Sequence, residues 1–206
     1  MKKYFVTAIS TDSGKTVVSA ILTNALQADY WKPVQAGTEL TDSNTIKALL
    51  RSNKSIIHEE SYLLNLAASP HLSAKVQNTY IDMNAIQLPD TKGNDLIIEG
   101  AGGILVPLNE TDCVADLIQQ LDAEIILISN HYLGSINHTL LTAQELKRRN
   151  IYVKGIVFNG SLNEESERII LHKTGYRFLL RILPETVITK ETIEKYEQTI
   201  LNNWYE

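Results

Sequence analysis

Short apolar segments recur along the chain, separated by stretches in which apolar residues follow a helical repeat. Within each segment consecutive residues are apolar, which suits strands buried on both faces of a helix-covered parallel sheet. Residues 3–8, 30–34, 94–99, 124–129 and 152–158 are predicted strands, and a late apolar run covers residues 178–183. Residues 15–27 and 189–202 are predicted helices, the first with Val17, Val18, Ile21, Leu22 and Leu26 facing inward.

Strands that alternate with helices indicate an α/β fold with a doubly wound, mostly parallel sheet flanked by helices. The pattern contains no linker, so residues 1–206 are expected to form a single domain. The segment 38–92 is less regular, with polar stretches at 41–44 and 78–84. In this architecture we expect such a segment at the carboxyl edge of the sheet, where ligands bind.

The strongest motif is Ala8-Ile9-Ser10-Thr11-Asp12-Ser13-Gly14-Lys15-Thr16, which leaves a predicted strand and opens a predicted helix. This context favours a phosphate loop of the NTPase type, because backbone N–H groups and a helix N-terminus then face the phosphates. Lys15 would reach the β- and γ-phosphates, and Thr16 would coordinate magnesium. The usual spacings place a glycine at Ile9 or Ala8. A chance Gly-Lys-Thr at a helix start is the alternative, and the flanking strand and helix weigh against it.

Three more charged residues are candidates for the same site. Glu99 ends a buried strand beside the glycine-rich stretch 100–103, which favours magnesium binding over a surface or capping role. Asp42 precedes a helix, where capping is the ordinary role of aspartate. Lys32 ends a short strand and is fixed by Pro33. It either faces the phosphate loop or protects an exposed sheet edge.

Charge and composition exclude several classes of protein. The chain carries 19 Lys and Arg against 24 Asp and Glu, a net charge of -5 that argues against a nucleic-acid partner. The basic cluster 147–149 is expected to end a helix. Apolar segments are too short for a membrane span or an export signal. The single cysteine, Cys113, is expected to be a small buried side chain in a reducing compartment, so a cytoplasmic location is predicted.

Several motifs in combination resemble the dethiobiotin synthetase family. Besides the phosphate loop they are Lys32-Pro33-Val34-Gln35-Ala36-Gly37, Ser69-Pro70-His71, Glu99-Gly100-Ala101-Gly102-Gly103, Leu133-Gly134-Ser135-Ile136-Asn137-His138 and Asn159. They occur in the family's order over residues 3–184. The Gly-Lys-Thr element is shared by many nucleotide enzymes, whereas the Lys-Pro-Val-Gln, Glu-Gly-Ala-Gly-Gly and Leu-Gly-x-Ile-Asn-His elements together are far more specific.

The resemblance implies an enzyme that uses ATP and Mg²⁺ to form a cyclic urea from 7,8-diaminopelargonate and CO₂. One amine captures CO₂ as a carbamate, whose oxygen attacks the γ-phosphate to give a carbamic–phosphoric anhydride. The second amine then closes the ring and expels phosphate. The negative charge that converges in these steps requires cations. Lys15 and Lys32 match the family's lysines, and Thr11 matches its carbamate contact.

The same resemblance assigns the remaining site residues. The magnesium set is Thr16, Asp42 and Glu99, which raises Asp42 above its capping role. The nucleotide-binding set is Asp12, Ser13, Gly14, Lys15, Thr16, Val17, Asp42, Glu99, Gly100, Ala101, Gly102, the adenine-reading Asn159, Gly160, and Leu183, Pro184 and Glu185 near the base. The substrate set is Thr11, Lys32, Ala36, Gly134 and Asn137. In the family the last two act across the two-fold interface of a homodimer. His71 and His138 lack a paired ligand spacing and are expected to hydrogen bond or pack.

Departures from the family pattern affect expected affinity more than reaction type. Ala8 replaces the loop's first glycine, Asp12 stands where many members have glutamate, and Ala36 replaces a frequent serine or threonine. The principal alternative is a partition- or carrier-type ATPase that acts as a switch. Such proteins carry a second lysine early in the phosphate loop, where this chain has Ile9 and Ser10. A cobyrinate-type synthetase would need an amidotransferase domain, for which the chain has no room.

Overall fold

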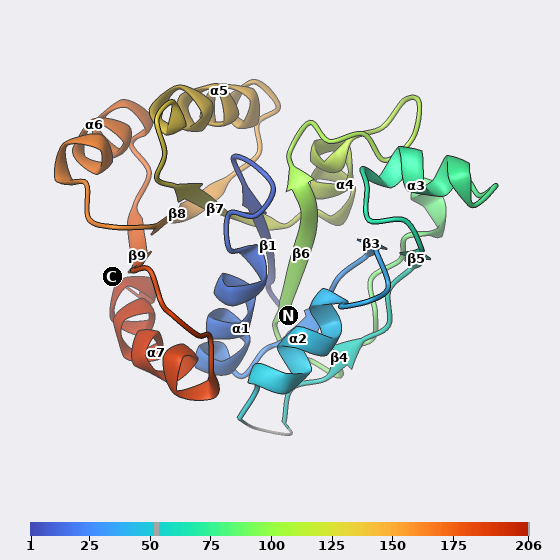
Figure 1. Ribbon diagram of the computed structural model, residues 1–206, viewed down its shortest axis with the longest axis horizontal. Coiled ribbons are helices and arrows are strands. Elements are labelled where there is room, and N and C mark those ends of the chain that lie inside the picture. Colours follow the sequence, from blue (N-terminus) through green and yellow to red (C-terminus); the bar gives the residue numbers. More distant parts are fainter. Residues whose placement is uncertain (52–53, 206) are drawn as a thin grey trace.

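The computed structural model describes residues 1–51 and 54–205, and its centre is a seven-stranded parallel sheet (Figure 1). The strand order is β4-β2-β6-β1-β7-β8-β9, so β1 lies between β6 and β7. The strands are β1 Lys3–Ala8, β2 Asp29–Trp31, β4 Ile57–His58, β6 Leu96–Gly103, β7 Glu124–Asn130, β8 Val153–Asn159 and β9 Phe178–Ile182. The predicted doubly wound parallel sheet is confirmed.

Helices cover both faces of this sheet. On one face lie α1 Lys15–Leu26, α2 Asp42–Leu49 and α7 Lys190–Tyr205, and on the other lie α4 Val114–Leu121, α5 Ser135–Arg148 and α6 Glu164–Thr174. Successive residues of a strand point to opposite faces. Ile97 therefore packs toward α1, whereas the next residue, Ile98, joins the cluster on the other face. This two-sided burial explains why the strands are continuously apolar.

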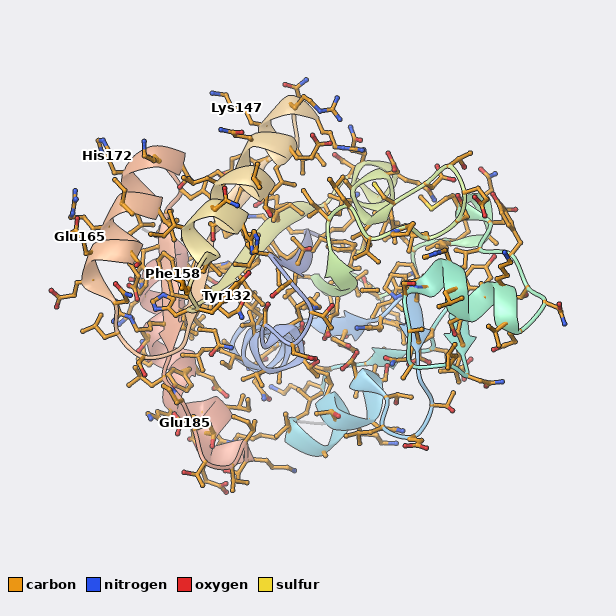
Figure 2. The ribbon with its side chains drawn as sticks, turned by 45° about the horizontal axis from the view of Figure 1, so that its top comes forward. Tyr132, Lys147, Phe158, Glu165, His172 and Glu185 are labelled. Carbon is orange, nitrogen blue, oxygen red and sulfur yellow. The ribbon has the colours of Figure 1, made fainter. Side chains whose placement is uncertain are left out.

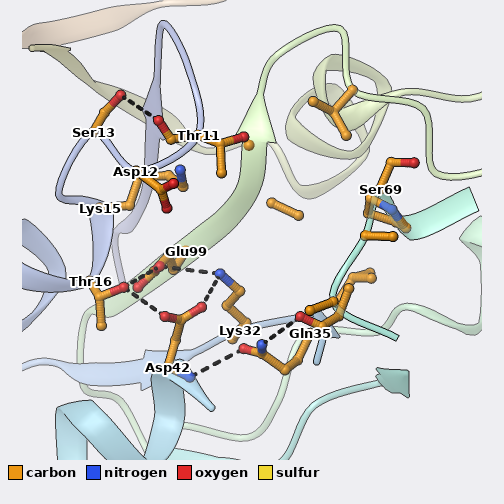
Figure 3. A pocket seen from close by; sticks show the side chains of 18 of the residues that line it. Thr11, Asp12, Ser13, Lys15, Thr16, Lys32, Gln35, Asp42, Ser69 and Glu99 are labelled. Carbon is orange, nitrogen blue, oxygen red and sulfur yellow. Dashed lines mark hydrogen bonds and ion pairs between the residues drawn. The ribbon is translucent and has the colours of Figure 1, made fainter. Parts of the chain in front are cut away.

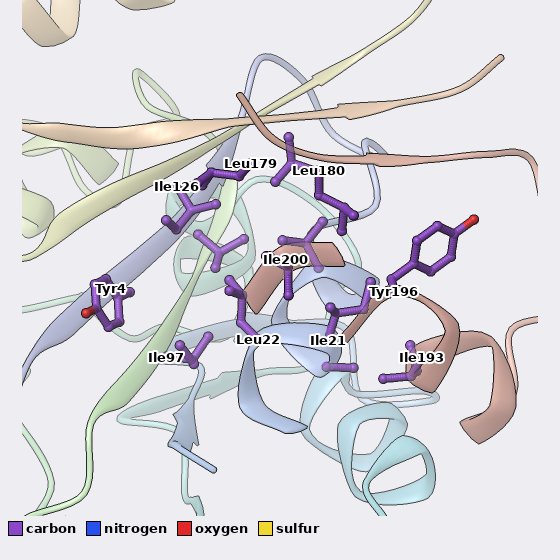
Figure 4. Close-up of a cluster of buried hydrophobic side chains, with 14 of the residues drawn as sticks. Tyr4, Ile21, Leu22, Ile97, Ile126, Leu179, Leu180, Ile193, Tyr196 and Ile200 are labelled. Atoms are coloured by element: carbon purple, nitrogen blue, oxygen red, sulfur yellow. The ribbon is translucent and has the colours of Figure 1, made fainter. Parts of the chain in front are cut away.

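The cluster under α1 and α7 fixes the phosphate-loop side of the sheet (Figure 4). Ile21 and Leu22 of α1 meet Ile126 of β7 and Ile200 of α7, and all four side chains are essentially inaccessible to water. Burial of each such side chain contributes about 1.5–3 kcal/mol. Because α1 begins directly after the phosphate loop, this packing also anchors that loop to the sheet.

The prediction of one strand over residues 30–34 is wrong, because the segment is split between two sheets. β2 ends at Trp31, and β3 (Val34–Ala36) pairs with β5 (Tyr62–Leu64) in a separate two-stranded parallel sheet. Pro33 lies at the break, and its missing N–H and fixed φ suit the exit from a strand better than its interior. Lys32 therefore lies at the junction of the two sheets.

The glycine-rich stretch after Glu99 also differs from expectation. The sequence predicts that the strand ends at Glu99, but β6 continues through Gly103. A Cβ atom added at Gly100 would lie 2.6 Å from Cε1 of Phe5, so glycine is what allows β6 to pass the neighbouring strand here.

Segment 38–92 contains α2, β4, β5, α3 Pro70–Val76 and the short 3₁₀ helix η1 Met83–Ala85. Its residues 67–70 lie at the ligand edge of the sheet, as expected. The basic cluster 147–149 ends α5, also as expected. Cys113 packs against the hydrophobic cluster beneath α4 and forms the N-cap of that helix, but it is only half-buried and not the fully buried side chain that was predicted. Over the described part of the chain, no helix combines the length and apolarity that crossing a bilayer requires.

Candidate active site

A cleft of about 830 Å³ opens at the carboxyl edge of the sheet, between the phosphate loop and the small sheet (Figure 3). The loop after β5 closes its other side with Ala67, Ala68, Ser69 and Pro70. Most of the predicted site residues line it: Thr11, Asp12, Ser13, Gly14, Lys15, Thr16, Val17, Lys32, Ala36, Asp42, Glu99, Ala101 and Gly102. The structure thus brings together residues from the phosphate loop, α1, β3, α2 and β6, with Lys32 between β2 and β3.

The phosphate loop joins β1 to α1 and is shaped by two residues with positive φ. Asp12 has φ 55°, and Gly14, the N-cap of α1, has φ 88°. Gly14 also allows close approach, since a Cβ there would lie 2.6 Å from Nδ2 of Asn159. No side chain caps the start of α1, so its first N–H groups remain available to an anion.

Lys32 lies between two carboxylates at the base of the cleft. Its Nζ is 2.5 Å from Oδ2 of Asp42 and 3.2 Å from Oε1 of Glu99, and it also donates to the carbonyl of Gly100. The Oγ1 of Thr16 lies 2.7 Å from Oδ1 of Asp42 and 3.0 Å from Oε1 of Glu99. The side chains of Lys32 and Glu99 are only 6% and 1% exposed, so these charges interact with little screening by water.

The ion pairs decide the protonation states of this centre. Burial alone would lower the pKa of Lys32, but the carboxylates of Glu99 and Asp42 outweigh it and raise that pKa. Burial alone would raise the pKa of Asp42, yet the Lys32 ammonium and the Thr16 hydroxyl hold it below its ordinary value. Burial, with Lys32 nearby, lowers the pKa of Lys15. Lys32 is therefore cationic and Asp42 anionic at neutral pH.

The oxygen atoms of Thr16, Asp42 and Glu99 form a donor set that fits Mg²⁺. Magnesium takes oxygen ligands, and nucleotide sites hold it with one or two carboxylates plus phosphate oxygens and water. Two carboxylates and a hydroxyl meet here beside the phosphate loop. Across residues 1–51 and 54–205, no group of three or more His, Cys, Asp or Glu residues that could hold a metal ion is found.

Asp42 does not cap its helix. The N-cap of α2 is Thr41, whose hydroxyl accepts from the N–H of Asn44, and Asp42 is the first helical residue. Its backbone N–H donates to Oε1 of Gln35, and its carboxylate turns toward Lys32. The capping interpretation of Asp42 is therefore wrong, because the preceding threonine already fills that position.

The residues expected near the base lie outside this cleft but at the same sheet edge. Asn159 ends β8 and donates through Nδ2 to the carbonyl of Ser13. Leu183, Pro184 and Glu185 follow β9, with Gly160 donating its N–H to the carbonyl of Ile182. Glu185 is tied to α7 by Lys195 and by the Tyr196 hydroxyl, and Figure 2 shows it beside that helix.

Gly134 and Asn137 are not brought into the cleft. They line a separate cavity of about 830 Å³ at the N-terminus of α5, where Gly134 is the N-cap. Tyr132, labelled in Figure 2, lines the same cavity, and its hydroxyl is 2.5 Å from Nδ1 of His138. His138 is therefore a hydrogen-bonding residue, as expected. The backbone N–H of His71 donates to the carbonyl of Pro107.

Sequence reasoning missed three residues that hold the site in place. Tyr30 donates its buried hydroxyl to Oε2 of Glu99, Gln35 accepts from Asp42, and Asn130 accepts from Ser13. Asn130 could have been noticed, because it directly follows a predicted strand at the ligand edge. Gln35 belongs to the Lys-Pro-Val-Gln motif, but the motif does not say what the side chain does. Tyr30 gave no such signal, since its role depends on a contact between distant segments.

Comparison with known proteins places this site in a family. A protein-family profile described as an AAA domain matches residues 2–192. ATP-dependent dethiobiotin synthetase from Cytophaga hutchinsonii is 72% identical over 100% of both chains, and that from Christiangramia forsetii is 43% identical over 97% of this chain and 98% of its own.

Among solved structures, a ParA family ATPase from Chlorobium tepidum superposes with a TM-score of 0.59, covering 100% of this chain and 95% of that one. Its identity is 12%, so this likeness establishes the fold alone. The full-length identity to the two synthetases goes further, and it agrees with the Lys32 motif and the glycine-rich strand after Glu99. The chain belongs to the ATP-dependent dethiobiotin synthetase family.

Proposed function

We propose that this chain, as a single nucleotide-binding domain, converts 7,8-diaminopelargonate and CO₂ to dethiobiotin at the expense of ATP. The observation that carries the proposal is Lys32. A buried cation beside Asp42 and Glu99, at the junction of the two sheets and opposite the phosphate loop, is suited to a reaction in which anions converge. The proposed setting is the cytoplasm, with no nucleic-acid or membrane partner.

The proposed reaction has three steps. One amine of the substrate attacks CO₂ and loses a proton, which gives a carbamate. The carbamate oxygen then attacks the γ-phosphorus of ATP, so that a new P–O bond replaces the bond to the leaving ADP. Finally the second amine attacks the carbamate carbon, the C–O bond to phosphate breaks, and the amine loses its proton. In the last two steps negative charge develops at oxygen atoms close to phosphorus, which cations must neutralise.

Each proposed role rests on the position of a side chain. Lys15, at the first turn of α1, is assigned to the β- and γ-phosphates. Lys32 is assigned to the carbamate. To bind it, the ammonium group would give up its ion pair with either Asp42 or Glu99. Thr11 and Ala36 line opposite parts of the cleft and are assigned to the substrate. Mg²⁺, held by Thr16, Asp42 and Glu99, would supply charge neutralisation at the phosphate oxygens.

The test of this function is whether ATP turnover depends on the diamine. With ATP, Mg²⁺ and bicarbonate, we expect little phosphate release until 7,8-diaminopelargonate is added, because the attacking oxygen belongs to the carbamate. Release should fall again when CO₂ and bicarbonate are removed. Equal ATP hydrolysis with and without the diamine would instead favour a switch ATPase.

We also propose that the active form is a homodimer in which Gly134 and Asn137 hold the substrate bound to the other subunit. Support comes from their position at the start of α5, where a helix N-terminus suits a carboxylate. Exposed apolar side chains line the cavity at that point, with Leu133 fully exposed and Tyr132 and Leu162 about half exposed. Apolar side chains that gather on the surface in this way are typical of an interface.

Mixing two inactive variants tests the shared site. We expect Asn137→Ala and Lys32→Gln each to lose activity alone. In a 1:1 mixture after subunit exchange, one site of each mixed dimer contains neither change, so activity should recover to about a quarter of wild type. The control is a mixture of Lys32→Gln with Lys15→Ala. Both residues lie in the cleft of the same subunit, so each site of a mixed dimer keeps one of the two changes and activity should not recover. If subunit exchange is demonstrated by native mass spectrometry and the Asn137→Ala mixture still does not recover, the shared site is ruled out, as it would be by a fully active monomer.

A further inference from the structure

Two asparagines at the ends of neighbouring strands grip the same residue of the phosphate loop. Asn130 of β7 and Asn159 of β8 are in register in the sheet. The Oδ1 of Asn130 lies 2.7 Å from the Oγ of Ser13, and Nδ2 of Asn159 donates to the carbonyl of Ser13 at 2.9 Å. Ser13 itself is fully buried. One loop residue is therefore held by its side chain and by its backbone.

The direction of the hydrogen bonds brings a second loop residue, Ser10, into the same network. The Oγ of Ser13 has a single proton, and its shortest contact to an obligate acceptor is to Asn130. The Oγ of Ser10 lies 2.8 Å from the Oγ of Ser13 and can donate to it. The result is a chain from Ser10 through Ser13 to Asn130, in which each hydrogen bond strengthens the next.

The loop needs such a brace because of its backbone. Asp12 is held at φ 55°, a left-handed conformation that aspartate adopts more readily than most residues but still at some cost, so contacts around the loop help to hold it there. Ala8, where the motif has glycine, ends β1 and has no positive φ, so the left-handed backbone of the loop lies at Asp12 and Gly14. The side-chain hydrogen bonds that join Ser10, Ser13 and Asn130 restrict the backbone of the loop to this conformation.

We propose that Asn130 is a positioning residue for ATP, which acts through Ser13 to hold the phosphate loop in its binding shape. Asn130 does not line the phosphate cleft, whereas Ser13 does. The residue therefore tunes nucleotide affinity without touching the reacting atoms. This inference rests on the proposed use of ATP at this loop, but it concerns how the loop is held and not which reaction follows.

A double-mutant cycle tests the inference. Asn130→Ala and Ser13→Ala should each weaken MgATP binding, measured by titration calorimetry, by about tenfold, the usual scale for a lost buried hydrogen bond. If Asn130 acts through Ser13, the double variant should also be about tenfold weaker and not a hundredfold. For Asn130→Ala, whose side chain does not line the phosphate cleft, we expect kcat at saturating ATP and the KM for the diamine to stay within twofold of wild type. Additive losses, or unchanged MgATP affinity in the Asn130 variant, would overturn the proposal.

The matched control is Asn94→Ala, which removes a partly buried amide that donates to Asp29 at the opposite edge of the sheet. It should lower the melting temperature and leave MgATP affinity unchanged, which separates loss of stability from loss of loop geometry. If Asn130→Ala does not fold, the MgATP affinities of Ser13→Ala and Ser10→Ala test the proposal instead. MgATP binding must be weaker for Ser13→Ala than for Ser10→Ala, and wild-type binding in both contradicts the brace. Wild-type protein without diamine-dependent turnover would contradict the proposed function and leave this binding test intact.

Discussion

Replacing Lys32 with glutamine should lower the turnover number by on the order of a hundredfold or more, while ATP affinity stays near wild type. The lysine meets the carbamate, which exists only after CO₂ is captured, so its charge matters in the transition state more than in the ATP complex. Single-turnover phosphate release at saturating ATP measures the first quantity, and titration with MgATP measures the second.

Lys15→Ala is the companion variant for this experiment. Lys15 belongs to the phosphate loop and should contact ATP before and during the reaction, so binding and turnover should fall together. If Lys32→Gln keeps near-normal turnover, Lys32 is only a structural cation, and the site loses the residue that most distinguishes it from a general phosphate-loop ATPase.

Stability must be followed in the same experiment, because Lys32 is the buried partner of two carboxylates. Removing one member of a buried ion pair typically costs about 3–5 kcal/mol, a large share of the stability of a domain. We expect the melting temperature of Lys32→Gln to fall and Mg²⁺ to restore part of it, since the cation can replace the ammonium between Asp42 and Glu99. If turnover stays low after Mg²⁺ has restored folding, the defect is in the chemical step and not in stability.

Glu99→Gln should lower Mg²⁺-dependent turnover by about a hundredfold, the scale of a lost charge-stabilising group. Asp42→Asn should act in the same direction and more weakly, because Asp42 is 27% exposed at its side chain and water can replace part of its contribution. Both substitutions keep the size of the side chain and remove its charge. The Mg²⁺ concentration for half-maximal turnover should rise in both variants.

Thr41→Ala is the matched control for Asp42→Asn, since it removes the true cap of α2 and leaves the carboxylate in place. Loss of a cap costs about 1 kcal/mol. The control should lower the melting temperature without changing the Mg²⁺ requirement. An Asp42→Asn variant that behaves like Thr41→Ala would return Asp42 to a purely structural role.

The sequence predicted those parts of the site that depend on local signals. A strand, a Gly-Lys-Thr and a helix are enough to place a phosphate loop, and the end of a buried strand is enough to place Glu99 at the same edge. Lys32 was placed correctly for a partly wrong reason. It lies at the predicted edge, but the strand expected to carry it ends at Trp31, and a second sheet begins beyond Pro33.

The remaining parts depend on register between distant segments, which a single sequence does not encode locally. Asp42 carries an ordinary helix-start pattern, and only the packing of α2 against α1 and β4 turns its carboxylate to Lys32. Residues 100–103 are rich in glycine, which is typical of a turn, yet they belong to β6, where Gly100 lies so close to Phe5 that a Cβ atom would clash. Asn130 and Asn159 matter because their strands end level with each other, a relation that appears only in the assembled sheet.

The central position of β1 has a consequence for how the protein reaches its native state. Both strands that pair with β1 lie far along the chain, since Lys3 is in register with Leu96 of β6 and Tyr4 with Glu124 of β7. Contacts so distant along the chain require the closure of long loops. The entropy lost in loop closure comes before the contacts stabilise the sheet, and this slows folding. At a synthesis rate of about 5–20 residues per second, the N-terminal segment waits roughly 5–25 seconds for both neighbours to be made. The phosphate loop leaves the ribosome first, yet it becomes competent to bind ATP only after β7 has joined the sheet.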